Sequence, residues 1–423
     1  MGTLVEKNYG GKMKKNFLFL GFAIPDDEME ETFYLDEFPS IQTHKFIWNM
    51  IKALENDNSF EYTYVSTRAV SDYPFYKRKF IKSKEWVVEL FDRKIKIKEM
   101  PFLNLGVLKS LTRFLCGLYY CYKEYYKVDN KGGIIVYSVH VPFMMIGKLI
   151  SKIFSIDFIV IWTDPPSIPN INDSFLKAKF RRIELLLSKY LMKRTSKVIA
   201  LTKYLAEDFA FGIPYLVIEG IIDENDINSE FLLKNSEGGK DSIIVVYSGS
   251  LSKRYGIDKI VESFCLLTDK RLQLVVYGRG DYEEDLKKIC MINENVHYKG
   301  FVTNEEIIKI QRDADFLINA RSADEYYVKY SFPSKTLEYM LSGTPLISTV
   351  LPGMPEDYMN YMLVLENNEP KTIAGLLQKV SLMNKTEKYK LGLKAMEFAK
   401  SKNYVNQGKK VVSFLLGEEG AKQ

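Results

Sequence analysis

The chain has 423 residues, of which 46% are hydrophobic and 27% are charged, and its formal net charge is +5. This globular composition excludes long disordered tracts, and the length suits two domains of roughly 200 residues each better than one core. The four cysteines and three histidines lack the spacing of metal ligands. A zinc or di-iron site is therefore excluded, and the thiols are typical of a reducing, cytoplasmic compartment.

The first apolar run is NFLFLGFAI, which begins at Asn16. It is too short to cross a membrane, and the acidic stretch PDDEMEE follows it where a signal peptide would have its cleavage site. We therefore predict that this run is the first buried strand. Residues 1–12 are interpreted as an N-terminal extension ahead of a natural start at Met13.

Short runs rich in Val and Ile alternate with longer helical patterns through both halves of the chain. They are FEYTYVS, GGIIVYSVH, DFIVIWTD, SKVIALT and PYLVIEG in the first half, and SIIVVYSGS, RLQLVVYG, NVHYKG, ADFLINA and TPLIST in the second. Apolar strands separated by helices indicate parallel sheets that are covered on both faces. The sequence predicts an α/β protein with two doubly wound domains, at residues 13–223 and 242–399, joined by a linker at 224–241.

Residues 75–127 are strongly basic, with 13 Lys or Arg against five Asp or Glu. Within this segment a stripe of helical period is formed by Leu108, Leu111, Leu115, Leu118, Tyr119, Tyr122 and Tyr126, and the residues off the stripe include Lys109, Arg113, Lys123 and Lys127. Two interpretations fit: attachment to an anionic membrane surface, or a helix that packs in its domain with its basic side in solvent. A nucleic-acid partner is the third idea, but no recognised nucleic-acid-binding motif accompanies the charge.

Ligands of parallel sheets bind beyond the carboxyl ends of the strands. In the second domain the loops at these ends are residues 248–256, 278–281, 300–306 and 320–335, and we expect them to converge on one crevice. The first loop is a glycine turn with Lys253 and Arg254, which suits a diphosphate, although an ordinary strand-to-helix turn has the same composition. The second loop, at Gly278, lacks the third glycine of a dinucleotide fingerprint and predicts no nicotinamide site.

The stretch SFPSKTLEYMLSG begins at Ser331 and brings Ser, Lys and Glu together at the start of a predicted helix. Pro333 suits the first turn, which leaves Ser334 and the first backbone N–H groups at the positive end of the helix, where an anion is favoured. Lys335 adds a positive charge. Glu338, one turn later, can accept two hydroxyl hydrogen bonds, as a carboxylate facing a ribose does. A capped helix with a solvated Lys and Glu is the alternative.

Taken together, these segments resemble the family-four glycosyltransferases, which use nucleotide sugars and have the GT-B fold. The resemblance is densest over residues 243–355, in VVYSGSLSKRYGIDKIVESF, LQLVVYGRGDYEEDLKKI, NVHYKGFVTNEEIIKIQRDADFLINAR and SFPSKTLEYMLSGTPLIST. In the first half it is carried by IIVYSVHVPFM, SKVIALTKYLAEDF and VIEGIID. The resemblance implies two Rossmann-like domains that face each other across a cleft, with a C-terminal helix at 400–423 that returns to the N-terminal domain.

The resemblance also implies retaining transfer from a nucleoside-diphosphate sugar, the co-substrate, with no metal ion or other cofactor. The implied donor-binding residues are Gly21, Ser250, Lys253, Arg254, Gly278, Phe301, Val302, Tyr330, Ser331, Phe332, Pro333, Ser334, Lys335 and Glu338. The active-site histidine of the family falls on His140, for which a core or cap histidine is the alternative. Asp164 is a candidate contact for the acceptor, and a turn-forming Asp before Pro is the alternative there.

Two positions depart from the family pattern. The first glutamate of the family's pair falls on Tyr330, and Glu325 is our candidate to take over part of its catalytic role. The phosphate-binding Arg and Lys of the family fall on Ser250 and Tyr255. Arg254, with Lys253 or Lys335, is then left to neutralise the diphosphate.

From these residues we predict a bacterial-type glycosyltransferase that extends a saccharide or lipid-linked saccharide, as in capsule or exopolysaccharide synthesis. It is expected in the cytoplasm, and on the inner face of the membrane if residues 75–127 bind an anionic membrane surface. Two alternatives share the fold: an inactive protein that binds nucleotide sugars, prompted by Tyr330, and a nucleotide-sugar epimerase. No nucleic-acid partner is expected.

Overall fold

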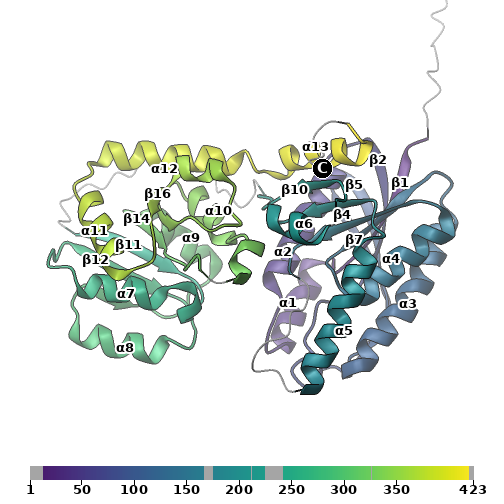
Figure 1. Cartoon of the computed structure of the whole chain (residues 1–423), viewed down its shortest axis with the longest axis horizontal. Coiled ribbons are helices and arrows are strands. Elements are labelled where there is room, and N and C mark those ends of the chain that lie inside the picture. The colour runs from purple at the N-terminus through teal and green to yellow at the C-terminus, as the bar shows by residue number, and fades with distance from the viewer. Residues whose placement is uncertain (1–12, 166–174, 211, 224–241, 325, 419–423) are drawn as a thin grey trace, which may run out of the picture. The chain divides into compact units, whose positions relative to one another are not determined.

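A computed structural model describes residues 13–165, 175–210, 212–223, 242–324 and 326–418. The chain forms two compact units (Figure 1). Unit 1 comprises Met1–Ala200, Ala206–Leu216 and Gly408–Gln423, and unit 2 comprises Leu201–Leu205 and Val217–Gln407. The proposed N-terminal extension and the proposed linker lie outside the described residues.

Unit 1 is built on an eight-stranded sheet in the order β10-β9-β8-β7-β1-β2-β5-β4. The strands are β1 (Lys15–Gly21), β2 (Phe60–Ser66), β4 (Lys84–Leu90), β5 (Arg93–Glu99), β7 (Lys131–Tyr137), β8 (Asp157–Trp162), β9 (Lys197–Ala200) and β10 (Tyr215–Val217), and a separate pair is formed by β3 (Phe80–Ile81) and β6 (Phe102–Leu103). From β9 to β5 every neighbouring pair is parallel, whereas β4 joins β5 antiparallel. The central strands are apolar on both faces because helices cover the sheet from both sides.

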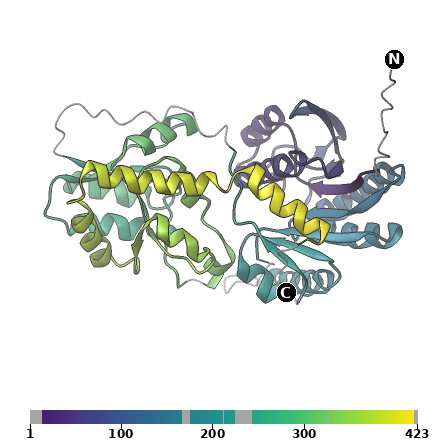
Figure 2. The same cartoon turned by 90° about the horizontal axis from the view of Figure 1, so that it is seen from above.

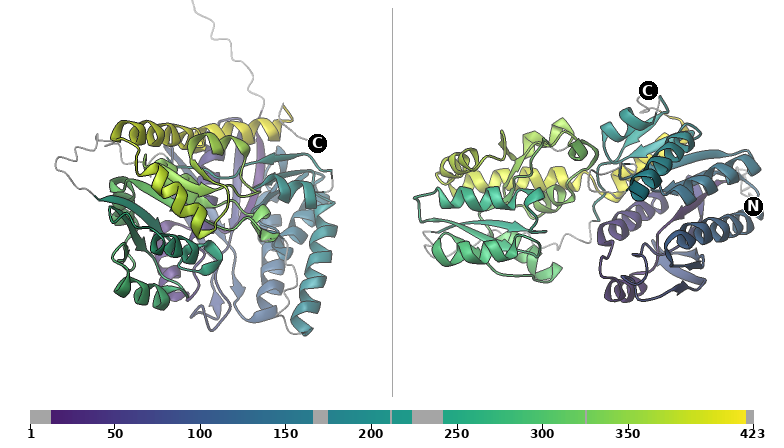
Figure 3. Two further views of the ribbon diagram at one scale, coloured as in Figure 1. Left: turned by 60° about the vertical axis from the view of Figure 1, so that its left-hand side comes forward. Right: turned by 60° about the horizontal axis from the view of Figure 1, so that its bottom comes forward.

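The helices of the first half are α1 (Asp26–Leu35), α2 (Ile41–Glu55), α3 (Gly106–Tyr126), α4 (Val141–Phe154), α5 (Phe175–Met192) and α6 (Lys203–Phe209). Helix α4 lies between α3 and α5, and the three run side by side (Figure 3). The last helix, α13 (Tyr404–Leu416), is yellow in Figure 2. Its residue Gly408 lies against the backbone of Ala53 in α2, and the Lys197 ammonium donates 2.8 Å hydrogen bonds to the carbonyls of Phe414 and Leu415. These contacts fix the end of the chain to unit 1.

The β4–β5 hairpin was not predicted, because this segment was interpreted only as a basic stretch. Its turn residues Phe91 and Asp92 have φ values of 51° and 58°. Two successive positive φ values are typical of the turn that suits the twist of a two-residue hairpin. The alternation in RKIKIKE, with Ile95 and Ile97 buried between lysines, is the signal for a half-buried strand that the sequence offered.

Unit 2 contains a six-stranded, fully parallel sheet in the order β13-β12-β11-β14-β15-β16. Its strands are β11 (Ile243–Ser248), β12 (Leu272–Tyr277), β13 (Val296–Tyr298), β14 (Phe316–Asn319), β15 (Leu346–Thr349) and β16 (Leu363–Leu365). Counted within the unit, this is the order 3-2-1-4-5-6 of dinucleotide-binding folds. The predicted α/β architecture is confirmed, and only the short strand β16 was missed in this half.

The helices of unit 2 are α7 (Ile257–Cys265), α8 (Glu283–Ile292), α9 (Asn304–Asp313), α10 (Ser334–Leu341), α11 (Pro370–Val380) and α12 (Lys385–Lys400), with short 3₁₀ turns at Lys253–Tyr255, Tyr326–Tyr330 and Glu356–Tyr361. One core lies between the sheet and α7, where the predicted apolar residues Ile257, Ile260, Val261 and Phe264 are all buried. A second core lies between the sheet and α10, and α12 packs on α10. Among the described residues, no helix is long and apolar enough to cross a membrane.

Candidate functional site

The strand order of unit 2 reverses between β11 and β14, so the loops that leave these two strands diverge around one point. Ligands of open α/β sheets bind at such a switch point, beyond the carboxyl ends of the strands. The loop after β11 carries Gly249 to Gly256, and the segment after β14 begins with Ala320 and Arg321. Gly256 lies against the carbonyl of Ala320, so the two loops are in direct contact.

All four predicted donor loops come together at this edge of the sheet. Gly278, with φ of 138°, donates its N–H to Gly300 over 2.8 Å and packs on the carbonyl of Gly249, where a side chain has no room. Lys335 of α10 lies across Gly249, since a Cβ built on that glycine would be 2.7 Å from Nζ. The lysine that the sequence placed at the mouth of the helix is therefore held over the loop that follows β11.

Helix α10 begins at Ser334, with Pro333 as its N-cap rather than within the first turn as predicted. The φ of Pro333 is −75°, close to the value that its ring imposes, so the residue fits either position. No side chain caps the helix start, which leaves its first N–H groups for another acceptor. Ser334 is exposed, and the Ser331 hydroxyl lies 3.5 Å from the carbonyl of Val328.

Glu338 is oriented by a buried polar network one turn into α10. Its Oε1 accepts a 2.7 Å hydrogen bond from Gln311 Nε2, which also lies 3.0 Å from Ser248 Oγ. The Tyr339 hydroxyl donates to the Ser248 carbonyl and accepts from the Ser248 N–H, both over 2.9 Å. The network joins α9, α10 and the end of β11. It leaves Glu338 half-buried with one oxygen occupied, so the carboxylate is fixed in direction and retains acceptor capacity.

Two guanidinium groups lie over the same pair of tyrosine rings at the switch point. Arg254 is 5.4 Å from the ring of Tyr255 and 4.8 Å from that of Tyr327, and Arg321 is 5.3 Å from each. Arg321 is buried, and its Nε has no hydrogen-bond partner among the described residues. A buried guanidinium with an unused donor is suited to an anion.

Sequence reasoning missed both Arg321 and Gln311. Arg321 had a signal, because it follows the strand ADFLINA directly and so lies at the ligand-binding edge. Gln311 had none, since it is one polar residue among several on α9 and only the packing of α9 against α10 brings it to Glu338.

Other predicted donor residues lie at the rim of this site. Lys253 is turned toward α8, where its Nζ is 3.4 Å from Asp285 and 5.4 Å from the ring of Tyr282. Ser250 is exposed and its carbonyl accepts a hydrogen bond from Tyr247. Phe301 is exposed beside the half-buried Val302, and Arg279 stacks on its ring at 4.9 Å.

Tyr330, where the resemblance predicts the family's first glutamate, is almost fully buried, with 1% of its surface exposed. Lys329 lies 4.8 Å from its ring. Phe332 is also buried and packs edge-on against Tyr358. These two side chains therefore offer little free surface to a ligand. Glu325, the candidate to take over part of the glutamate's role, lies outside the described residues.

In unit 1, His140 precedes α4 at the end of β7 and packs edge-on against Phe143, with ring centroids 4.9 Å apart. Burial, together with the charges of Arg113 and Lys109, lowers the pKa of His140 to about 3. The imidazole is therefore neutral at physiological pH. Its Nδ1 is buried without a hydrogen-bond partner in the described structure.

Beside the ends of β7 and β8 lies a hollow of about 250 Å³ that contains the predicted acceptor residue Asp164. Arg113 of α3 also lines it, with only 4% of its surface exposed. Its Nη2 donates a 2.5 Å hydrogen bond to the carbonyl of Arg68, and burial lowers its pKa to about 9, so it stays charged at neutral pH. Hydroxyls of Thr43, Ser138 and Thr163 complete a polar lining.

Gly21, at the end of β1, has a structural reason to be glycine. A Cβ there would lie 2.8 Å from the Phe19 ring and 3.3 Å from Cβ of Tyr137. Its carbonyl accepts hydrogen bonds from the Thr67 N–H and the Ser66 hydroxyl. In the described part of the chain, no three His, Cys, Asp or Glu side chains come close enough together to hold a metal ion.

Comparison with known proteins agrees with this architecture. The structure is similar to that of Anabaena Alr3699/HepE in complex with UDP, with a TM-score of 0.58 and 14% identity over 95% of this chain and all of that one. It is also similar to sucrose-phosphate synthase from Thermosynechococcus elongatus, with a TM-score of 0.61 and 14% identity over 96% of this chain and all of that one. These likenesses establish the GT-B fold.

Sequence comparison adds a family for the second half of the chain. A 120-residue segment is 24% identical to the uncharacterized glycosyltransferase MJ1607 of Methanocaldococcus jannaschii, and the alignment covers 27% of this chain and 29% of that protein. Residues 228–391 match the family of glycosyl transferases group 1. The protein thus has the GT-B fold, and its residues 228–391 match the model of glycosyl transferases group 1.

Proposed function

We propose that this protein is a retaining, metal-independent glycosyltransferase. It moves a sugar from a nucleoside-diphosphate sugar to a saccharide or lipid-linked saccharide, in the synthesis of a cell-surface polysaccharide such as a capsule or exopolysaccharide. The observation that carries the proposal is the pairing, at the switch point of unit 2, of a cationic loop edge with the oriented carboxylate of Glu338. The group 1 domain match supports the same assignment.

In this proposal the diphosphate lies between the loop after β11 and the start of α10. Lys335 across Gly249, the free N–H groups of α10, and the guanidinium groups of Arg254 and Arg321 supply the positive charge. The departing nucleoside diphosphate gains negative charge as the glycosidic bond breaks. Donors that are already in place lower that barrier, so no nucleophile of the protein is needed. Glu338 accepts hydrogen bonds from the ribose.

The acceptor is assigned to unit 1, at the hollow lined by Arg113 and Asp164. Because His140 is neutral at physiological pH, we assign it to orienting a hydroxyl group or the donor sugar, and not to donating a proton. Glu325 stays our candidate for the role of the missing family glutamate. The proposed location is the cytoplasm, on the inner face of the membrane.

The first test is a thermal-shift panel of UDP-, GDP- and ADP-sugars, because a ligand that binds only the folded state raises the melting temperature. We expect one base to give a clear shift. Release of the nucleoside diphosphate is then measured with and without saccharide acceptors. Release that requires an acceptor supports the transferase. Binding without release indicates an inactive binder, conversion of the donor alone indicates an epimerase, and no binding of any nucleotide sugar overturns the proposal.

A further inference from the structure

Helix α3 is oriented with its apolar stripe outward. Its six outermost stripe residues are between 42% and 62% exposed: Leu108, Leu111, Leu115, Tyr119, Tyr122 and Tyr126. The spacing of three or four residues places them on one side of the helix. The interpretation that the stripe packs in the domain, with the basic side in solvent, is therefore wrong. The stripe is the exposed side.

The inward side of α3 is held by polar contacts, among them those of Lys109 and Arg113, which the second interpretation placed in solvent. Lys109 Nζ donates to the carbonyl of Val70 over 2.6 Å and lies 2.7 Å from Asp72 Oδ1. Tyr125 donates from its hydroxyl to the carbonyl of Asn16 over 2.5 Å. Together with the Arg113 bond to the backbone, these contacts extend along the helix and fix its rotation. The apolar stripe cannot turn inward without breaking them.

Further exposed apolar side chains lie on α4, which packs on α3, and on α5, which packs on α4. Helix α4 contributes Ile153, and α5 contributes Ile183, Leu186 and Tyr190, all exposed. The three helices lie side by side (Figure 3), with α4 between α3 and α5. An exposed apolar stripe that runs along a whole helix, as on α3, marks an interaction site in a folded protein.

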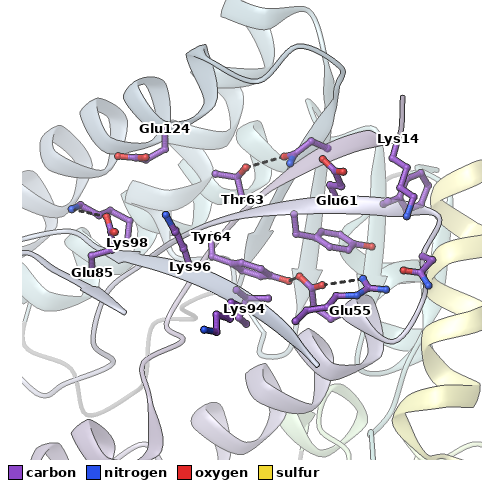
Figure 4. Close-up of a pocket in the computed structure, with 16 residues that line it drawn as sticks. Lys14, Glu55, Glu61, Thr63, Tyr64, Glu85, Lys94, Lys96, Lys98 and Glu124 are labelled. Carbon is purple, nitrogen blue, oxygen red and sulfur yellow. Dashed lines mark hydrogen bonds and ion pairs between the residues drawn. The ribbon is translucent and has the colours of Figure 1, made fainter. Parts of the chain in front are cut away.

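Lysines of β5 lie near α3, on the side that carries Glu124, and Figure 4 shows Lys94, Lys96 and Lys98 around the hollow there. Lys94 and Lys96 are exposed there, and neither has an ion-pair partner among the described residues. Lys98 lies 5.9 Å from the ring of Tyr120 in α3 and pairs with Glu85. The three lysines line a hollow of about 700 Å³ together with four glutamates, Glu55, Glu61, Glu85 and Glu124, the last of which belongs to α3. The β4–β5 hairpin thus carries unpaired positive charge beside the apolar helix.

We propose that the outer face of α3, with the lysines of β5, is a docking surface for an anionic lipid bilayer. An amphipathic helix lies in the membrane interface with its apolar side toward the acyl chains, and flanking lysines bind the acidic headgroups. Tyrosines are favoured at that depth because their rings are apolar and their hydroxyls remain wet. This surface stands whether or not the proposed glycosyl transfer is correct.

A second copy of the chain fits the surface less well. In a two-fold dimer the same patch meets itself, so two copies of a segment with 13 Lys or Arg against five Asp or Glu would be brought together. Like charges across an interface are unfavourable, whereas an anionic bilayer neutralises them. The lysines next to the apolar stripe therefore favour an anionic bilayer over a second copy of the chain as the partner of this surface.

The test is sedimentation of the full chain with vesicles of phosphatidylcholine containing 30% phosphatidylglycerol, or of phosphatidylcholine alone. We expect binding to the anionic vesicles that the Leu111→Glu/Leu115→Glu variant loses. The Lys94→Glu/Lys96→Glu variant should bind at least tenfold more weakly, because each lysine near the surface contributes roughly a fivefold gain. All four positions are exposed, so folding should be preserved, and circular dichroism checks it.

The matched control is Met291→Glu/Ile292→Glu on α8 of unit 2, where two apolar side chains are 83% and 85% exposed. This variant should bind like the wild type. Equal binding of all variants, or no binding of the wild type to anionic vesicles, would overturn the proposal. Analytical ultracentrifugation supplies a further decisive outcome. A dimer that Leu111→Glu/Leu115→Glu dissociates would assign the surface to self-association instead.

Discussion

Gln311 of α9 donates a 2.7 Å hydrogen bond to Glu338 of α10, and this contact gives the carboxylate its direction. Gln311 is 1% exposed and is itself held against Ser248, at the end of β11. The position of Glu338 is therefore set by three elements of unit 2 and not by α10 alone. A residue outside the ligand loops thus becomes part of the proposed ribose site.

If Glu338 binds the ribose, Glu338→Ala should weaken binding of the preferred nucleoside diphosphate by roughly ten- to a hundredfold. A hydrogen bond to a charged group contributes about 1.5–3 kcal/mol. Calorimetric titration measures the change. The 2′-deoxy nucleoside diphosphate serves as control, since the wild type should discriminate against it and the variant should not. Unchanged affinity in the variant would remove Glu338 from the site.

Gln311→Met should have a smaller effect, roughly three- to tenfold on the same affinity. The carboxylate remains but loses its orienting donor, a net hydrogen bond of about 1 kcal/mol. The Gln311→Asn variant should bind no more tightly than Gln311→Met, because the shorter amide side chain does not reach the carboxylate of Glu338. A Gln311→Met protein that binds as tightly as the wild type would show that the carboxylate needs no orientation.

Arg321→Met and Arg254→Met should each weaken binding of a nucleoside diphosphate by roughly tenfold and leave binding of the bare nucleoside unchanged. The reason is that a guanidinium contributes to the affinity for phosphate and not for the base. Lys270→Met is the matched control, because Lys270 is a surface cation of unit 2 paired with Glu294. Equal losses for nucleoside and diphosphate would indicate damage to the fold rather than a phosphate contact.

The sequence predicted where the strands of unit 2 end, but it did not predict which side of α3 is buried. Buried strands such as β11 were predicted because a parallel strand covered on both faces is apolar throughout, and the residues after it follow from the fold. Periodicity also located the stripe of α3, but it does not say which side of a helix is buried. Lys109 and Arg113 point inward because backbone carbonyls and Asp72 receive them, and those partners are 37 to 45 residues away in the chain.

Sequence reasoning also missed the β4–β5 hairpin and the Gln311 network, each for its own reason. Lysines of β5 alternate with buried isoleucines, yet the net charge of the segment dominated its interpretation. Gln311 depends on how two helices pack, which no local pattern encodes. The ends of strands were therefore predictable, whereas the partners that orient a side chain were not.

Replacing His140 should make unit 1 more resistant to acid. Its pKa is about 3 in the folded chain, below the value of about 6.5 for an unfolded histidine. Between these values the unfolded chain holds the proton and the folded chain does not, so acidification favours unfolding. Between pH 7 and pH 4 the free energy of unfolding of the wild type should fall by roughly 2–3 kcal/mol more than that of His140→Asn. All three tryptophans, at positions 48, 86 and 162, lie in unit 1, so their fluorescence in urea reports this unit. Parallel pH dependence in both proteins would contradict the prediction.

The buried ion pair of Arg68 and Glu99 should dominate the stability of unit 1. Arg68 Nε donates to Glu99 Oε1 over 2.7 Å, Glu99 is fully buried, and Arg68 is nearly so. Glu99→Ala removes the fully buried partner and leaves the guanidinium with Glu28, whose Oε2 lies 2.5 Å from Arg68 Nη2. Removing one partner of a buried pair costs about 3–5 kcal/mol, and the remaining contact with Glu28 places the expected loss at the lower end, about 3 kcal/mol. The double variant Arg68→Met/Glu99→Leu should recover part of that loss, because it leaves no unpaired buried charge. The exposed pair Lys77 and Glu37 is the control, and Glu37→Ala should cost less than about 1 kcal/mol. Tryptophan fluorescence in urea measures all three variants, and a Glu99→Ala loss no larger than that of Glu37→Ala would show that the guanidinium finds water or another partner.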